Sequence, residues 1–387
     1  MERRTFVANT ILGSASLFLE RALGQGVEQV RLPSPPPILR RGLPGYQQSP
    51  NAMPGLYPGR VVELQDSRAI QDNHVSQPTV RRMIEQGMKE LTGESSAHRA
   101  WERFVTPDDI VGIKINPSGA PACCSSPEIV REVIAGLKSA GVPDRNILIY
   151  DRYSDEVQLG SYHVLLPVGI RIDGIENRAF DLSGYDLNVY CQACFFGEWE
   201  TRSYLARVVS QTVTKIVNIP TMKDHSAVGV TGCLKNLGYG SFNNVARSHQ
   251  APITFTDPLI GMMCSVEPLR SKAVLHIMDG MRQVWHGGPL TQVQSFIAQP
   301  GILLVGTDPV AVDTIELDTI TKKRDLEGAL SLWDRNPANI TSDNREFYRN
   351  SHKNLFFRQP AHIEQAGQLG LGVWDVKKID RRTIKLG

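Results

Sequence analysis

Long apolar segments, runs of basic residues and an appreciable net charge are all missing from this sequence. Its 387 residues include 42 Lys and Arg against 40 Asp and Glu, a formal net charge of +2 at pH 7. No five basic residues are consecutive, so neither nucleic acid nor an anionic membrane surface is indicated as a partner. No stretch beyond the N-terminus reaches the about 20 apolar residues of a membrane-spanning helix, and no span is expected in the mature chain. Ordinary apolar content at this length predicts a globular protein with a large core.

Cysteine is scarce, with six in the chain, and one pair has a recognisable spacing. Cys191 and Cys194 form C-x-x-C, which occurs in redox pairs, in half of a metal site and as two structural thiols. The adjacent Cys123 and Cys124 would complete four ligands if the fold brought the two pairs together. A metal or iron–sulfur redox protein is therefore one alternative for the function.

The N-terminus has the features of a twin-arginine signal peptide in the expected order. Arg3 and Arg4 begin an R-R-x-F motif, and an apolar stretch over residues 7–19 follows, with small residues up to Gly24. We expect residues 1–24 to be the signal peptide of a periplasmic or extracytoplasmic protein. The alternative is a surface helix with two chance arginines. Twin-arginine export carries folded proteins, often ones that acquire a cofactor before export.

Proline and glycine are concentrated between residues 31 and 60. Such a composition sustains neither a helix nor a central strand, so residues 25–59 are predicted to be a linker or a surface-hugging arm. Residues 60–387 are then expected to form a single α/β domain.

From residue 60 onward, short β-branched runs alternate with stretches of helical periodicity. Strand, helix and strand follow one another within about 40 residues, which is typical of a βαβ unit with parallel strands. The predicted class is therefore α/β, with a mostly parallel sheet flanked by helices in Rossmann-like layers. The predicted strands cover 110–115, 146–150, 214–219, 273–278 and 302–305, and the predicted helices cover 78–92, 127–137, 203–213 and 309–320.

Polar residues follow several of these strands. In open α/β sheets the ligand lies beyond the carboxyl ends of the strands, which directs attention to Asn116, Asp151, Lys223, Asp279 and Asp308. Asp308 precedes a proline at a predicted helix start, so a helix N-cap explains it equally well.

The segment over residues 219–238 has the densest set of reactive and ligand-binding residue types. Thr231 is placed to cap a helix that begins near Gly232, whose free N–H groups and dipole would favour an anion. Lys223 and Lys235 would add positive charge beside His225. The alternative is a solvated loop and helix with ordinary surface lysines.

The run over residues 216–236, which contains V-N-I-P-T-M-K-D-H-S and V-T-G-C-L-K-N, resembles the signature of the domain of unknown function 362 family. Further agreement lies at 112–116, 279–281, 287–289, 306–313 and 370–372, within a resemblance over residues 60–385. The family is defined by sequence and lacks an agreed reaction. The resemblance therefore points to particular residues of the chain but implies no activity. Some members carry ferredoxin-type iron–sulfur segments, and this chain has no four-cysteine run of that kind. The positions that match the family pattern are Lys114, Asn116, Lys223, His225, Thr231, Lys235, Asn236, Asp279, Asp308 and Asp313.

The first hypothesis is an enzyme that acts on a small anionic ligand, either a carboxylate or a phosphate. His225 would be the general acid or base, because the unperturbed pKa of histidine lies near physiological pH. Asp279 and Asp313 would orient it or bind a divalent cation. The predicted catalytic residues are His225, Lys223 and Asp279, and the predicted substrate-binding residues are Lys114, Asn116, Thr231, Gly232, Lys235, Asn236 and Asp313.

Two other hypotheses stay open. The first is the cysteine-bound metal or iron–sulfur centre, and the second is a non-catalytic periplasmic binding or accessory protein that uses the same cleft. Among the remaining histidines, His276 is expected in the core, whereas His98, His249 and His352 are expected to face solvent.

Overall fold

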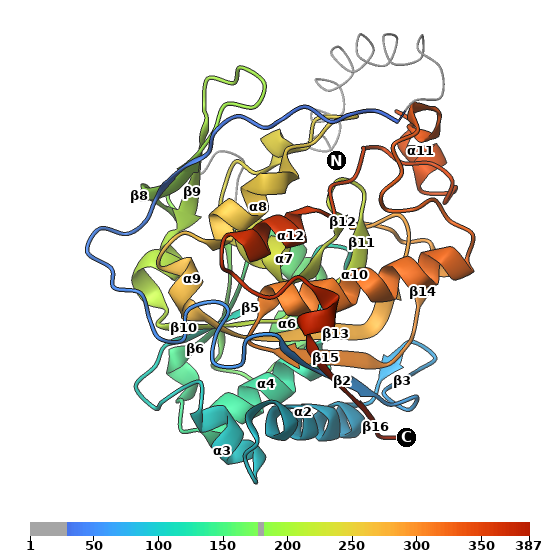
Figure 1. The fold of residues 1–387 in the computed structure, drawn as a ribbon. Helices are drawn as coiled ribbons and strands as arrows, with labels where there is room; N and C mark the ends of the chain where they lie inside the picture. The colour runs from blue at the N-terminus through green and yellow to red at the C-terminus, as the bar shows by residue number, and fades with distance from the viewer. Residues whose placement is uncertain (1–28, 177–181) are drawn as a thin grey trace.

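The structure is a computed structural model that describes residues 29–176 and 182–387, and it shows an α/β fold around a mixed sheet of 11 strands (Figure 1). The continuous part of the sheet has the order β16 (Asp380–Lys385), β2 (Arg60–Gln65), β15 (Ile302–Gly306), β13 (Ala273–Val284), β10 (Lys215–Asn218), β5 (Val111–Lys114), β6 (Ile147–Tyr153) and β7 (Arg171–Glu176). Three short strands join beside β13, namely β11 (Thr221–His225), β12 (Gly229–Val230) and β14 (Ile297–Ala298).

The strands from β13 to β7 run parallel, as the sequence predicts. β10 pairs in parallel with both β13 and β5, and β6 pairs in parallel with both β5 and β7. β15 is antiparallel to β13 and to β2. The register places Lys114 opposite Asn218 and Tyr150, so the carboxyl ends of three neighbouring strands are level. All five predicted strands are confirmed.

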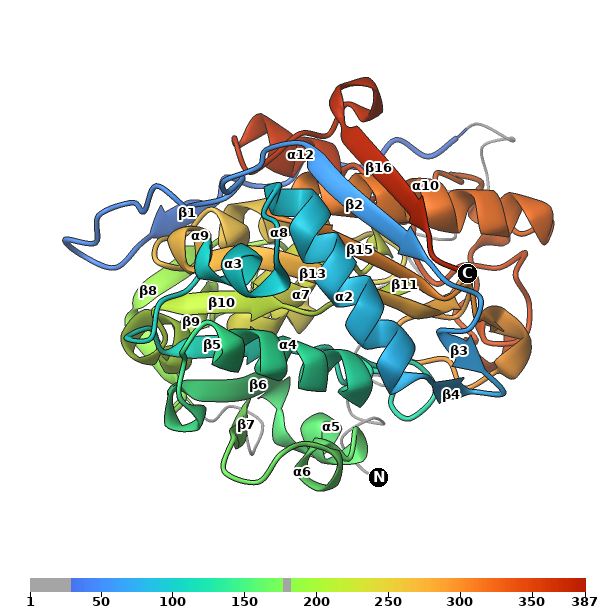
Figure 2. The same ribbon diagram turned by 90° about the horizontal axis from the view of Figure 1, so that it is seen from below.

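One face of the sheet is covered by α2 (Gln77–Thr92), α3 (Ala97–Glu102) and α4 (Pro127–Ser139), which lie side by side in Figure 2. In α2 the buried residues include Val80, Ile84 and Met88, whose spacing gives the helix one apolar face. These side chains pack with apolar residues from β2 and β5 in one core. The predicted helices over 78–92 and 127–137 are therefore confirmed.

The opposite face carries α7 (Gly232–Ser241), α8 (Thr256–Cys264), α10 (Pro309–Leu326) and α12 (His362–Gln368). Neighbouring residues of β2 belong to different cores, Val61 on this side and Val62 on the other, because successive side chains of a strand point to opposite faces. The sheet is thus buried on both faces, as expected of a mainly parallel sheet. Helix α10 confirms the predicted helix at 309–320.

A second, antiparallel sheet is formed by β1 (Leu39–Arg41), β8 (Tyr185–Gln192) and β9 (Arg202–Ala206). The prediction of a helix over 203–213 is wrong for its first half, which β9 occupies, whereas a single π-helical turn forms over Val208–Thr212. A short apolar run is compatible with either element, and here Leu205 and Ala206 are fully buried through pairing with β8.

Residues 29–59 follow the surface in an extended path, coloured blue in Figure 1. Backbone N–H groups of Leu43 and Met53 donate to the carbonyls of Glu267 and Arg270, each at 2.9 Å. The described part of the predicted arm is therefore attached to the domain. The predicted signal peptide at residues 1–24 lies outside the described residues.

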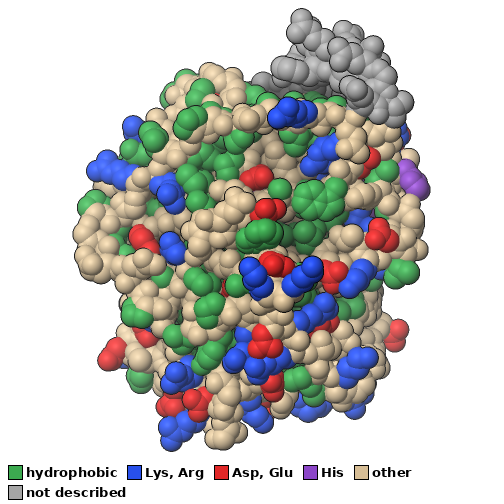
Figure 3. All heavy atoms as spheres, in the orientation of Figure 1, with side chains coloured by type: hydrophobic (Ala, Val, Ile, Leu, Met, Phe, Trp, Pro, Cys, Tyr) green, Lys and Arg blue, Asp and Glu red, His purple; other side chains and the backbone are tan. Residues whose placement is uncertain are grey.

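The surface agrees with the near-zero net charge. Acidic and basic side chains are interspersed over the face in Figure 3, without one large patch of a single sign. Among residues 29–176 and 182–387, no helix is both long enough and apolar enough to cross a membrane.

Candidate functional site

A cavity of about 540 Å³ lies beyond the carboxyl ends of β5 and β6 and beside α7. Asn116 and Ser118 follow β5, whereas Asp151 and Arg152 come from the end of β6. The remaining wall includes His225, Lys235, Asn236, Tyr239, Arg247, His249 and Phe356. The site is therefore at the sheet edge where the sequence predicts it, and four predicted residues line it: Asn116, His225, Lys235 and Asn236.

Lys114 lies directly behind the cavity wall and is fully buried. Its ammonium group forms an ion pair with Asp151 and donates to the Ile115 carbonyl at 2.7 Å and to Asn236 Oδ1 at 3.0 Å. Burial lowers the pKa of Lys114, and the charge of Asp151 opposes that effect. A Cβ atom at Gly240 would overlap the end of the Lys114 side chain, which explains the glycine in the last turn of α7.

Lys223 occupies the next position behind the wall and is also fully buried. Its Nζ donates to Asn116 Oδ1 at 2.6 Å and to the Ser118 carbonyl, and it has no ion pair with a carboxylate in the described part of the chain. Asn116 Nδ2 in turn donates to Asn236 Oδ1 at 3.0 Å. The two ammonium groups are thus joined through a pair of asparagines, and burial lowers the pKa of Lys223.

Lys235 reaches the cavity itself from α7. Its Nζ lies 5.4 Å from the centre of the Tyr239 ring, and the described residues provide it with neither a hydrogen-bond acceptor nor an ion-pair partner. Burial, reinforced by the positive charge of Lys223, lowers the pKa of Lys235 to about 7. Its amine is therefore partly neutral near physiological pH.

The surroundings of His225 do not favour the acid–base role expected of it. The backbone N–H groups of Ala227 and Val228 donate to Nδ1 at 3.1 and 3.4 Å, so the neutral ring must carry its proton on Nε2. Burial lowers the pKa of His225 well below its ordinary value, and Lys235 adds to this effect. The imidazole is consequently a neutral hydrogen-bond donor at pH 7 and is poorly suited to accept a proton.

The sequence analysis missed several lining residues. Glu156 comes from a short helix after β6, accepts a hydrogen bond from Ser118 Oγ at 2.9 Å and has a pKa raised by burial. His249 lines the cavity next to His225, with ring centres 5.5 Å apart, so the expectation that it faces solvent is wrong. Burial lowers its pKa to about 3. Neither Glu156 nor His249 follows a predicted strand directly, unlike Asp151, which the sequence already indicates at a strand end.

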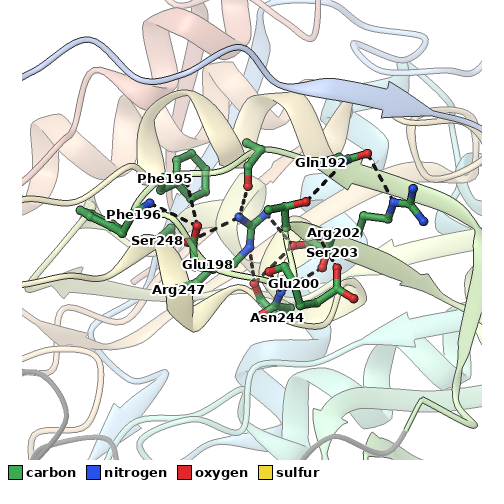
Figure 4. Close-up of polar contacts among 12 residues, drawn as sticks. Gln192, Phe195, Phe196, Glu198, Glu200, Arg202, Ser203, Asn244, Arg247 and Ser248 are labelled. Carbon is green, nitrogen blue, oxygen red and sulfur yellow. Dashed lines mark hydrogen bonds and ion pairs between the residues drawn. The ribbon is translucent and has the colours of Figure 1, made fainter.

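Arg247 lines the cavity and holds the β8–β9 connection (Figure 4). Its guanidinium donates to the Ala193 carbonyl, lies 3.8 Å from Glu198 and stacks 4.7 Å from the centre of the Phe195 ring. Glu198 also accepts from the Phe195 backbone N–H at 3.0 Å. These contacts occupy Arg247, and an ion pair with Glu176 at 2.9 Å occupies Arg152. Among the described residues of the wall, Lys235 is therefore the lysine or arginine without a carboxylate partner.

Asp279 is not among the residues that line the cavity. Its carboxylate accepts from the backbone N–H groups of Ser126 at 2.6 Å and Met281 at 2.9 Å. These bonds connect β13 to the start of α4, since Ser126 is the N-cap residue of that helix. The geometry therefore supports a structural role for Asp279 in place of the expected catalytic one.

The N-terminus of α7 is already occupied by a side chain of the protein. Asp313 from α10 accepts from the backbone N–H groups of Cys233 at 2.5 Å and Leu234 at 2.9 Å. Thr231 makes no capping hydrogen bond, and Gly232 has a φ of +61° at a position where a Cβ would overlap the Asp313 carboxylate. The helix begins at Gly232 with Thr231 at its N-cap position, as predicted, but the Thr231 side chain makes no capping bond. The anion expected at this terminus is the carboxylate of Asp313.

Asp308 is confirmed as the N-cap of α10, since its Oδ1 accepts from Ala311 N at 2.9 Å.

Within the described ranges, no three or more His, Cys, Asp or Glu side chains are grouped so that they could hold a metal ion. The two cysteine pairs are therefore not brought together as a four-ligand site, and all six cysteines are free thiols.

A model of the family described as a domain of unknown function (DUF362) matches residues 111–318, more than half of the chain. Comparison with curated proteins gave no match. The chain is similar to a crystal structure of a Thermotoga maritima protein from the Northeast Structural Genomics Consortium, at 8% sequence identity with a TM-score of 0.39. That similarity covers 67% of this chain and 60% of the other. The matched family region contains Lys114, Lys223 and Lys235.

Proposed function

The chain belongs to the family of the domain of unknown function DUF362, and on the cavity geometry we propose that it is an enzyme acting on a small anionic ligand. The ligand would occupy the 540 Å³ cavity, which is within the range of about 300–1,000 Å³ typical of small-molecule sites. The single observation that carries the proposal is that two lysines at this cavity, Lys223 and Lys235, have no carboxylate partner in the described part of the chain.

Three ammonium groups lie at the cavity or directly behind it, and among the described residues only that of Lys114 is paired with a carboxylate. Lys223 has neutral oxygens as its acceptors, and Lys235 has no hydrogen-bond acceptor among the described residues. A buried charge is costly unless a charge of opposite sign accompanies it. An anion in the cavity would supply that charge.

The roles proposed for the lining residues differ from those inferred from the sequence. Lys235 takes the place of His225 as the proton-transfer group, because its pKa of about 7 makes both protonation states available. His225 donates a hydrogen bond from Nε2 to an oxygen of the ligand, and burial keeps the ring neutral. Asn116 and Asn236 position Lys223 and Lys114 behind the ligand.

Replacing Lys235 by Met is expected to weaken binding of small anions roughly 10- to 100-fold, since a charge-assisted hydrogen bond contributes about 1.5–3 kcal/mol. Isothermal titration with phosphate and with pyruvate at a pH below 7 measures the loss. In the wild type, affinity should fall as the pH rises through about 7, because Lys235 then loses its charge.

Lys377→Met is the matched control, because Lys377 is exposed on the surface. Its affinity and its pH dependence should equal those of the wild type. Equal affinities for Lys235→Met and Lys377→Met would contradict the proposed site. Binding without turnover of any carboxylate or phosphate offered would favour a non-catalytic binding protein.

We also propose that the chain is exported by the twin-arginine route, on the basis of Arg3, Arg4 and the apolar residues 7–19. The double change Arg3→Lys and Arg4→Lys keeps the charge, and it is expected to leave the protein uncleaved in the cytoplasm. Cell fractionation with N-terminal sequencing measures the outcome. The matched control changes another pair of consecutive arginines, Arg40 and Arg41, to Lys, and this variant should still be exported. Equal export of both variants would contradict the proposal.

A further inference from the structure

We propose that Lys235 is a nucleophilic amine that forms an imine with the carbonyl group of a small oxo acid. This inference rests on the proposed function, because it requires an anionic ligand in the same cavity. It adds the substrate class, a carboxylate that also carries a ketone or an aldehyde.

The geometry around Lys235 favours a nucleophile over a fixed cation. Lys114 and Lys223 have two or more polar acceptors each, whereas the described residues offer Lys235 Nζ only the face of Tyr239, at 5.4 Å. An amine with no acceptor to organise its protons is free to approach a ligand atom. Burial and adjacent cations are also the conditions that activate a lysine towards carbonyl compounds.

The neighbouring groups supply what a carbonyl condensation needs. His225 presents a neutral Nε2–H, fixed by the two backbone N–H groups at Nδ1, and this donor can polarise the carbonyl oxygen of the substrate. Glu156 lines the same cavity, where Ser118 Oγ donates to it at 2.9 Å. Burial raises the pKa of Glu156, so its carboxyl group can hold the proton that water loss requires.

The reaction balances with these groups alone. The neutral amine of Lys235 attacks the carbonyl carbon, the π electron pair moves to oxygen, and a proton passes from nitrogen to that oxygen to give a carbinolamine. Glu156 then protonates the hydroxyl group, the C–O bond breaks, and the nitrogen lone pair forms the C=N bond. The products are a protonated imine, one water molecule and the carboxylate of Glu156. The positive charges of Lys114 and Lys223, behind the lining residues Asn116 and Asn236, would favour the carboxylate of the oxo acid.

Reductive trapping tests the inference. The full chain is incubated with glyoxylate, pyruvate or 2-oxoglutarate in the presence of cyanoborohydride, and the adduct is located by peptide mass spectrometry. We expect one reduced adduct per chain on the peptide that contains Lys235. In Lys235→Arg, which keeps the charge but cannot form the imine, this adduct should disappear while titration still detects binding of the oxo acid.

The pH profile of trapping provides a measurement on the unaltered protein. The adduct at Lys235 should form readily near pH 7, where its amine is partly neutral, whereas exposed lysines in general should react only at a pH closer to the ordinary lysine pKa of about 10.4. The yield of the Lys235 adduct relative to that of exposed lysines should therefore rise at least tenfold when the pH is lowered from 9 to 7. A change of this size is expected for amines whose pKa values differ by about three units.

The outcomes separate this inference from the proposed function. Binding of oxo acids without an adduct at Lys235 would overturn the imine and leave the anion site standing. An adduct spread over surface lysines with equal pH profiles would overturn it as well. A protein that binds no carboxylate or phosphate in titration would overturn both.

Discussion

Replacing Asp224 by Asn is expected to lower the free energy of unfolding by about 3–5 kcal/mol, the range observed when one partner of a buried ion pair is removed. Asp224 is fully buried, and its Oδ2 lies 3.0 Å from Arg358 and 3.5 Å from Arg324. Both arginines are only 1% exposed. The amide would leave two buried guanidinium groups without a counter-charge, and urea unfolding measures the loss.

Arg358 makes the effect large because it has few alternatives to Asp224. Its Nε and Nη2 have no hydrogen-bond partner within the described residues, whereas Arg324 also donates to the Trp285 carbonyl at 2.7 Å. Burial lowers the pKa of Arg358, and the negative charge of Asp224 is the largest influence that opposes this shift. Adding Arg358→Met to Asp224→Asn should therefore restore part of the lost stability, since it removes an uncompensated charge.

Asp144→Asn is the matched control. Asp144 forms an exposed ion pair with Lys138 at 2.8 Å, and such pairs contribute about 0–1 kcal/mol. An equally small loss for Asp224→Asn would mean that the buried arginines do not depend on this carboxylate. No recovery in the double variant would lead to the same conclusion.

Much of the central sheet can be predicted from the sequence, because its strands are buried on both faces. The β-branched runs that form β5, β10 and β15 end at polar or turn residues, so their positions and their carboxyl ends are visible in the sequence. β9 was mistaken for a helix, because a short apolar run does not reveal which element it forms. Its pairing with β8 is a tertiary contact.

The candidate site could be predicted only where its residues follow a predicted strand or lie in the segment after β10. Asn116, His225 and Lys235 are in such positions. Arg247 and His249 come from a connection beyond α7, which no local pattern places beside the cavity.

Strand periodicity explains why Asp224 differs from its neighbours. Successive side chains of β11 point to opposite sides, so Lys223 and His225 lie on the side of the site, whereas Asp224 contacts Arg324 and Arg358.

Asp313→Ala is expected to lower the free energy of unfolding by about 2–4 kcal/mol, because each buried N–H group left without an acceptor costs about 1–3 kcal/mol. The change removes the acceptor of Cys233 N and Leu234 N at the start of α7. Asp343→Ala is the matched control: Asp343 accepts from Arg345 N at 2.8 Å in the same way, but on an exposed surface helix. Its loss should be at most about 1 kcal/mol.

The difference between wild type and Asp313→Ala should also depend on pH. Burial raises the pKa of Asp313 above its unfolded value, although the two N–H groups oppose this. The folded state therefore holds this proton more tightly than the unfolded chain does. The stability contributed by protonated Asp313 is complete below the unfolded pKa of about 3.9 and is lost as the pH rises through the raised pKa. The penalty of the alanine variant should accordingly be larger at pH 5 than at pH 8.

Unfolding of both proteins at the two pH values measures this contribution together with the effect of Asp313 on neighbouring Glu316, whose pKa is raised by burial and further by Asp313. A penalty that grows with pH would mean that the folded state prefers the ionised carboxylate. Equal losses for Asp313→Ala and Asp343→Ala would mean that the carboxylate does not hold the start of α7.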